Sequence, residues 1–212
     1  MKKLILVVTA LTFITSNAFS QDNELDRRDD ISLGLKIGGN YANVYDTEGE
    51  EFDADAKLGL AVGAFLSIPI GTYLGIQPEV LFSQKGFKAT GSVLGSEYEI
   101  TRTTNYLDVP IFLAFKPSEF ITFVAGPQFS YLLSRNEKFD SEFGLVELEE
   151  EFENENIRKN TLSASLGFDI NIDNIVIGAR AAWDLQDNKG DGTSSTPRYR
   201  NTWLQATVGF RF

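Results

Sequence analysis

The sequence contains no cysteine and no histidine among its 212 residues. Without cysteine the chain forms no disulfide and has no thiol to carry a lipid anchor after an export signal. Without histidine, imidazole acid–base chemistry and the usual zinc sites are excluded. Carboxylate chemistry is the catalytic option that remains, and no pair of carboxylates stands out. The sequence therefore predicts no enzyme, no catalytic residue, no cofactor and no metal site.

Positive charge and long apolar runs are also scarce. The chain has 19 Lys and Arg against 30 Asp and Glu, a net charge of −11, so nucleic acid is excluded as a partner. The apolar run 4–14 is far shorter than the roughly 20 residues that a helix needs to cross a membrane. Lys2 and Lys3 precede it, and small residues follow at 18 and 20, which predicts a signal peptide over 1–20. The aperiodic polar residues 21–30 predict a short, disordered periplasmic leader.

From Ile31 onward, apolar and polar residues alternate with a period of two, which is typical of strands with two different faces. The clearest case is the hairpin 105–134. Eight such segments are predicted, at 31–41, 57–68, 74–85, from between 98 and 105 to 115, 121–134, 161–172, 175–186 and from before 204 to 212. Tight turns are predicted at 69–72, 116–119 and 173–174, and long, largely acidic loops at 44–56, 87–97, 135–159 and 188–197.

Short turns at one end and long loops at the other are typical of transmembrane barrels. The pattern predicts an all-β fold, an eight-stranded antiparallel up-and-down transmembrane β-barrel over 31–212. Its apolar set would face lipid, whereas a soluble lipocalin-like barrel would turn the same set inward. Two aromatic girdles are predicted, formed toward the loops by Tyr41, Phe82, Tyr131 and Trp183 and toward the turns by Tyr73, Phe115, Phe120 and Phe212.

The polar face contains charges of both signs. The interior of an eight-stranded barrel is just large enough for its own side chains, so we expect these charges to form an ion-pair plug in preference to a conduction path. The predicted lumen network comprises Lys36, Glu79, Asp108, Asp169, Arg180, Asp184 and Arg211. Within it, Glu79 is expected to pair with Arg180 or Arg211.

Three further features lie at the loops and the C-terminus. Residues 187–192 have some likeness to a calcium loop, but Lys189 stands where an oxygen ligand is wanted, so a plain turn is predicted. The glutamate run 147–155 is predicted to be a solvated loop, with attraction of cations as the alternative. Phe210 and Phe212 end the last strand and are predicted to be the assembly signal for the barrel-assembly machinery.

Several motifs resemble the PorT-like porin family of outer-membrane β-barrel domains. They lie at 74–86, 106–110, 125–128, 33–40 and 209–212, and the likeness covers Ile31 to Phe212. The resemblance implies location in the outer membrane of a Gram-negative-type envelope and brings no catalytic residues. Most members have no assigned molecular role, and the founding member is associated with protein secretion.

The predicted function is structural or interactive at the cell envelope. The partners would be outer-membrane lipid, the assembly machinery and a protein at the acidic loops, or the barrel would belong to an envelope or secretion assembly. A small-solute porin is the first alternative. A secreted, soluble lipocalin-like barrel is the second.

Overall fold

The computed structural model describes residues 26–46, 54–93, 96–141, 144–150, 159–188 and 199–212. The predicted signal peptide and the start of the predicted leader lie outside these ranges. The described residues form nine strands: β1 (Ser32–Asp46), β2 (Ala54–Gly71), β3 (Leu74–Val93), β4 (Ser96–Ser118), β5 (Ile121–Ser141), β6 (Gly144–Glu150), β7 (Asn160–Ile172), β8 (Ile175–Asp184) and β9 (Tyr199–Arg211). Across these ranges, no helix has the length and apolar character needed to cross a membrane.

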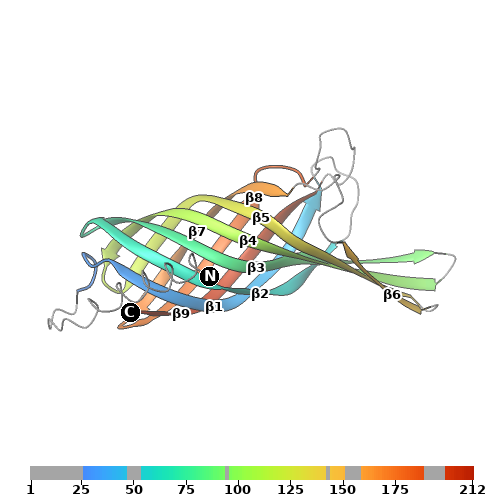
Figure 1. Cartoon of the computed structure of the whole chain (residues 1–212), viewed down its shortest axis with the longest axis horizontal. Coiled ribbons are helices and arrows are strands. Elements are labelled where there is room, and N and C mark those ends of the chain that lie inside the picture. Colours follow the sequence, from blue (N-terminus) through green and yellow to red (C-terminus); the bar gives the residue numbers. More distant parts are fainter. Residues whose placement is uncertain (1–25, 47–53, 94–95, 142–143, 151–158, 189–198) are drawn as a thin grey trace, which may run out of the picture.

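Eight of the strands close into a ring. β1, β2, β3, β4, β5, β7, β8 and β9 pair in this order, all antiparallel, and β9 pairs back onto β1 (Figure 1). Because β1 and β9 pair over most of their length, the ring has no free edge within this part. The prediction of an eight-stranded antiparallel up-and-down barrel is confirmed.

The apolar set faces outward all round the ring. On the adjoining strands β1 and β9, Ile37 lies opposite Val208, and these side chains are 58% and 55% exposed. Lys36, the neighbour of Ile37 in the chain, points inward and is 6% exposed. An apolar outer surface and a polar interior are the arrangement of a barrel in lipid. The soluble lipocalin-like alternative, which requires the opposite facing, is therefore excluded.

The predicted girdle aromatics lie on this outer surface. Tyr41 and Tyr131 are exposed at the end where the long connections lie, and Phe82 and Trp183 are half-buried there. Toward the tight turns, four aromatic side chains are exposed: Tyr73, Phe115, Phe120 and Phe212. The belt between these two sets marks the height of the barrel that faces lipid.

The tight turns are short connections that each join two neighbouring strands into a hairpin. Ile172 pairs with Ile175, so Asp173 and Asn174 form a two-residue turn, as predicted. The φ of Asp173 is 50°, which is the left-handed conformation that two-residue hairpin turns need. The other two turns lie slightly later than predicted, at 72–73 and 119–120, because β2 and β4 continue through register shifts into residues assigned to the turns.

Two of the predicted long loops are largely strand. β3 and β4 continue as one ladder as far as the pair Val93 and Ser96, where a loop over 87–97 was predicted. β5 likewise runs to Ser141, and β6 folds back on it. The prediction of a loop over 135–159 was therefore also wrong in large part. A strand beyond the membrane is not divided between lipid and lumen, so its sequence need not show the alternation that reveals the strands of the membrane part.

The outer parts of these strands form what we call the protruding sheet, which consists of residues 87–93 of β3, 96–104 of β4, 135–141 of β5 and all of β6 (Figure 1). Residues 147–150 of the predicted solvated glutamate loop belong to β6, and 151–155 lie outside the described residues. The other two predicted loops are described only at their ends, because 47–53 and 189–198 lie outside the described ranges. Most of the calcium-like stretch falls in the second of these.

The segment before β1 is tied to the end of the barrel that carries the tight turns. Residues 28–30 form a turn and a bend, and the Asp30 amide donates to the Arg27 carbonyl over 3.3 Å. The Lys116 ammonium donates to the Arg28 carbonyl over 3.0 Å, and the Thr72 hydroxyl donates to Asp29 over 3.1 Å. The prediction of a disordered leader is thus wrong for 26–30, because the side chains of Thr72, in the β2–β3 turn, and Lys116, near the end of β4, hold this part.

Candidate functional site in the barrel lumen

The lower layer of the lumen is a compact group of charges that we define as Lys36, Gln77, Glu79, Asp169 and Arg180. Each comes from an inward position of β1, β3, β7 or β8, and none is more than 6% exposed. The two cations and two carboxylates balance, which is the condition under which charges are retained away from water.

Glu79 is the centre of the lower layer. It forms an ion pair with Lys36, lies 3.6 Å from the Arg180 guanidinium and accepts a hydrogen bond from Gln77 over 3.0 Å. Arg180 in turn donates to both oxygens of Asp169 over 2.8 Å. Both bonds come from the same nitrogen, Nη2, and each is a charge-assisted hydrogen bond, roughly twice as strong as one between neutral groups. Strands that do not pair with each other are thereby connected across the lumen.

The upper layer, farther toward the protruding sheet, consists of Lys85, Tyr106, Asp108, Ser130 and Trp203. The Lys85 ammonium lies 3.0 Å from Asp108 and donates to Ser130 over 3.3 Å. It also lies 3.7 Å from the centre of the Trp203 ring and 4.7 Å from that of Tyr106, within range of cation–π attraction. Lys85 was absent from the predicted network, although its polar-face position in the alternation could have identified it.

Asp184, a predicted member, joins this region through neutral partners. Its carboxylate accepts hydrogen bonds from the Ser163 hydroxyl over 2.7 Å and from the Asn201 side chain over 2.6 Å. Among the described residues it forms no ion pair. The alternation predicted that Asp184 points inward, and it does. It contained no information about whether the partner of this carboxylate is a cation or an amide.

An outer cluster closes the lumen at the base of the protruding sheet. It consists of Phe87, Arg102, Glu137 and Tyr199, from β3, β4, β5 and β9. The Arg102 guanidinium lies 5.1 Å from the Phe87 ring and 5.6 Å from the Tyr199 ring, and it donates to the Tyr199 hydroxyl over 2.8 Å. Glu137 forms ion pairs with both Arg102 and Arg135. Side chains from opposite walls thus meet across the mouth.

The outer cluster should make the protruding sheet sensitive to acid. Burial alone would raise the pKa of Glu137, but hydrogen bonds and charge from Arg135 and Arg102 outweigh it and lower this pKa. A carboxyl group whose pKa is lowered by folding stabilises the folded state at pH values above its pKa in the unfolded chain, about 4.3. This stabilisation is lost as the pH falls through the pKa of the group in the folded state. We expect the protection of backbone amides against hydrogen exchange, relative to their intrinsic rates, to fall below about pH 4 in β4 and β5 beyond the membrane. Glu137→Gln should remove most of this pH dependence, and an equally acid-sensitive variant would contradict the assignment.

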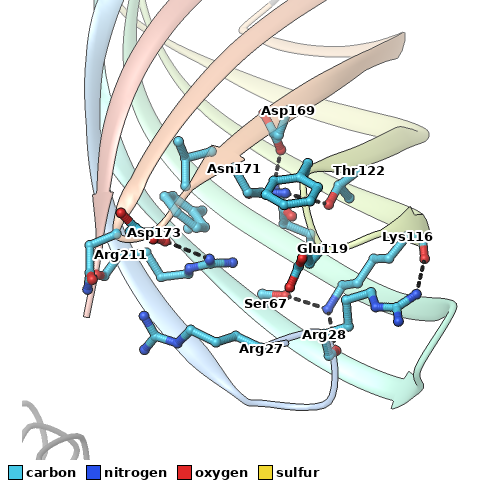
Figure 2. A pocket seen from close by; sticks show the side chains of 15 residues that line it. Arg27, Arg28, Ser67, Lys116, Glu119, Thr122, Asp169, Asn171, Asp173 and Arg211 are labelled. Carbon is cyan, nitrogen blue, oxygen red and sulfur yellow. Dashed lines mark hydrogen bonds between the residues drawn. The ribbon is translucent and has the colours of Figure 1, made fainter. Parts of the chain in front are cut away.

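A vestibule opens at the tight-turn end, below the lower layer (Figure 2). Its volume is about 330 Å³, and Arg27, Arg28, Lys116, Glu119 and Arg211 are among the residues that line it. Arg28 is bound to Asp26, and hydrogen bonding from Arg28 lowers the pKa of that carboxyl. From the asymmetry of transmembrane barrels, we expect this end to face the periplasm and the protruding sheet to face the exterior.

Arg211 belongs to the vestibule and not to the charge network in which it was predicted. It is the last residue of β9, at the rim of the barrel, where its guanidinium donates to the Asp173 carbonyl over 2.9 Å. Of the two predicted ion-pair partners of Glu79, Arg180 and Arg211, only Arg180 is therefore within reach. Lys116, which was assigned to a turn, is instead an inward position of β4 and is 5% exposed.

The end of β9 places two predicted signal residues side by side. Phe210 and Phe212 are on the outer face, 50% and 42% exposed, and their rings pack edge to face with centres 5.4 Å apart. Across the residues that the structure describes, no group of three or more carboxylates is arranged to hold a metal ion. What the site does chemically is therefore to occupy the lumen with matched charges, leaving a cavity at one end.

The comparisons with known proteins agree with this architecture. No curated protein sequence matches the chain. The crystal structure of Ail, the attachment invasion locus protein of Yersinia pestis, has a TM-score of 0.51 at 15% identity and covers 86% of this chain and 99% of that one. Its complex with the heparin analogue sucrose octasulfate has a TM-score of 0.50 at 16% identity, with the same coverage. OprG from Pseudomonas aeruginosa has a TM-score of 0.39 at 12% identity over 87% of this chain and 98% of that one.

At such identities the two structures of Ail show the fold alone. The model of a protein family, the outer membrane protein beta-barrel domain, matches residues 19–190. The match covers most of the chain and includes all strands of the ring except β9. The chain therefore belongs to the outer membrane protein beta-barrel domain family and is a small outer-membrane protein whose eight-stranded barrel lies in the lipid bilayer.

Proposed function

We propose that this barrel is an interaction protein of the cell surface, in which the membrane part serves as an anchor and the protruding sheet binds a protein partner. The observation that carries the proposal is the sheet itself. It extends the strands of the barrel outward as a continuous hydrogen-bonded structure (Figure 1). Such a sheet offers a partner a preformed surface, so that binding requires less ordering than a flexible loop would.

The edge of the sheet supports a specific mode of binding. Among the described residues, β6 pairs with β5 alone and stands last in the strand order. The outer edge of such a strand presents unpaired backbone donors and acceptors, which can accept an added strand from another protein. We therefore propose strand addition to β6 as the means of recognition.

The filled lumen argues against the porin alternative. Lys36, Glu79 and Arg180 meet across the lower layer, and Arg102 with Tyr199 spans the outer mouth. In planar bilayers we expect the purified protein to give no stable stepwise conductance, whereas a general porin inserted in the same way should give it. Stable steps from the wild-type protein would instead favour a small-solute porin.

Photo-crosslinking on intact cells tests the interaction. A photoreactive residue placed at Leu145 or at Val146 in β6 should yield the same protein adduct. The yield of this adduct should fall when this protein without the photoreactive residue is added in excess. The same group at Leu204, on the lipid face of β9, is the matched control and should label lipid. If both β6 positions yield no protein adduct while Leu204 labels lipid, the proposed role of the sheet is wrong.

Two finer aspects belong to the same proposal. The resemblance of residues 74–86 and 106–110 to the PorT-like family supports membership of an envelope or secretion assembly. The outward pair Phe210 and Phe212 supports recognition of β9 by the barrel-assembly machinery. We propose no catalytic role, because the lumen carboxylates are engaged: Glu79, Asp108 and Asp169 each by a cation, and Asp184 by hydrogen bonds from Ser163 and Asn201.

A further inference from the structure

The vestibule contains two cations that the barrel does not neutralise. The Lys116 ammonium donates to the Ser67 hydroxyl over 3.1 Å and to the Arg28 carbonyl over 3.0 Å. Arg211 donates to the Asp173 carbonyl, and its buried Nε has no hydrogen-bond partner. Every acceptor of these two side chains is a neutral oxygen. In the lower layer, by contrast, each cation lies against a carboxylate.

The carboxylates near the vestibule do not supply the missing charge. Asp169 is held by Arg180, and Asp26 is held by Arg28. Asp29 and Asp30, on the segment before β1, are near enough to attract Lys116, but Asp29 accepts from the Thr72 hydroxyl and Asp30 lies 3.9 Å from Arg27. Among the described residues, neither forms an ion pair with Lys116 or Arg211. Glu119 and Asp173 line the vestibule, but within the described residues neither forms an ion pair with Lys116 or Arg211. A cation withdrawn from water and left with neutral partners is costly, and an anion bound between the two would remove that cost.

The geometry suits one anionic group. Lys116, at the end of β4, and Arg211, at the end of β9, extend into the vestibule from opposite sides (Figure 2). Arg27 and Arg28 lie on the segment that crosses the mouth below them. The carboxylates of Glu119 and Asp173 on the same cavity would repel a polyanion, so the charge pattern selects a ligand with a single anionic group.

The inner walls suit a ligand that also carries hydroxyl groups. Gln77, Thr122 and Asn171 provide polar side chains, and Asn171 donates to the Thr122 hydroxyl over 3.1 Å. Phe65 and Phe120 provide apolar surface beside them. The cavity volume, about 330 Å³, lies at the lower end of the range of small-molecule sites. A ligand that fits these walls has hydroxyl groups, an apolar ring face and one anionic group. An acidic or phosphorylated sugar has all three.

We propose that the vestibule is a binding site for such a solute, taken up from the periplasmic side. Its carboxylate or phosphate lies between Lys116 and Arg211, and its hydroxyl groups contact Thr122 and Asn171. The site is independent of the protruding sheet, because it lies at the opposite end of the barrel.

Calorimetric titration of the whole protein in a polyoxyethylene detergent tests the proposal. Glucose 6-phosphate and gluconate are the anionic probes, and glucose is the neutral control. We expect at least one anionic probe to bind about tenfold or more tightly than glucose, since a charge-assisted hydrogen bond contributes that much. Inorganic phosphate should bind more weakly than glucose 6-phosphate, because it leaves the polar and aromatic walls uncontacted.

Charge variants separate the site from general attraction of anions. Lys116→Gln and Arg211→Gln should each weaken binding of the better probe about tenfold. Lys159→Gln makes the same change of net charge at an exposed position. Lys159 lies just before β7, at the end of the barrel away from the vestibule, so this variant should leave binding unchanged. If Lys116→Gln fails to fold, the half-buried Arg211 still provides the test. Equal binding of glucose and both anions, or equal weakening by Lys159→Gln, would overturn the proposal.

Discussion

Replacing Glu79 by alanine should lower the free energy of unfolding by about 3–5 kcal/mol, the usual cost of removing one partner from a buried ion pair. Lys36 would lose its carboxylate while remaining 6% exposed. Arg180 would keep Asp169 but lose its second carboxylate. Urea unfolding in lipid vesicles, followed by the mobility shift of the heat-modifiable barrel on gels, measures the change.

Two controls make this result specific. Glu99→Ala removes a carboxylate from an exposed pair with Lys88, whose members are each 43% exposed, and should leave the urea midpoint unchanged. The double variant Glu79→Leu with Lys36→Met removes both members of the buried pair. It should be more stable than either single variant, because no unpaired charge is left in the lumen. A Glu79→Ala barrel as stable as wild type would show that the lower layer does not stabilise the fold.

Placing a charge on the lipid face should also have a large effect. Leu166 lies in the middle of β7 between Ala125 of β5 and Ala181 of β8, and it is 48% exposed toward lipid. Leu166→Arg should cost about 2–4 kcal/mol, the expected penalty for arginine near the midplane of the bilayer. The fraction of protein that folds into vesicles of defined composition, and its urea midpoint, measure this penalty.

Position along the strand provides the matched control. Ile172 is the last residue of the same strand, also faces outward and is 51% exposed. Ile172→Arg should cost only about 0–1 kcal/mol, because the penalty falls toward the membrane interface. If Leu166→Arg were as stable as Ile172→Arg, the depth that we assign to the middle of β7 would be wrong.

The sequence alone determined the membrane part of this molecule. In a barrel wall, each inward residue meets a polar lumen and each outward residue meets lipid, so the period of two appears in every strand. That regularity identified eight strands, and the alternation of tight turns with long loops indicated their antiparallel order. The charges of both signs in the polar set, the aromatic girdles and the terminal phenylalanine decided the facing, which turned Glu79, Asp169 and Arg180 inward. The polar set also contained Lys85, which was left out of the predicted network. The inward position of Lys116 was missed, because this residue was assigned to a turn.

Only the tertiary structure decided which charges meet and what lies beyond the membrane. Glu79 meets Lys36 and Arg180 across the lumen, and such contacts between strands that are not neighbours depend on the closure and stagger of the ring, which no periodicity encodes. The strands of the protruding sheet are held by backbone hydrogen bonds and are not divided between lipid and lumen, so the alternation of the membrane part does not extend to them. Lys116 and Arg211, 95 positions apart in the sequence, come to share one cavity because β4 and β9 both end at the same mouth of the barrel.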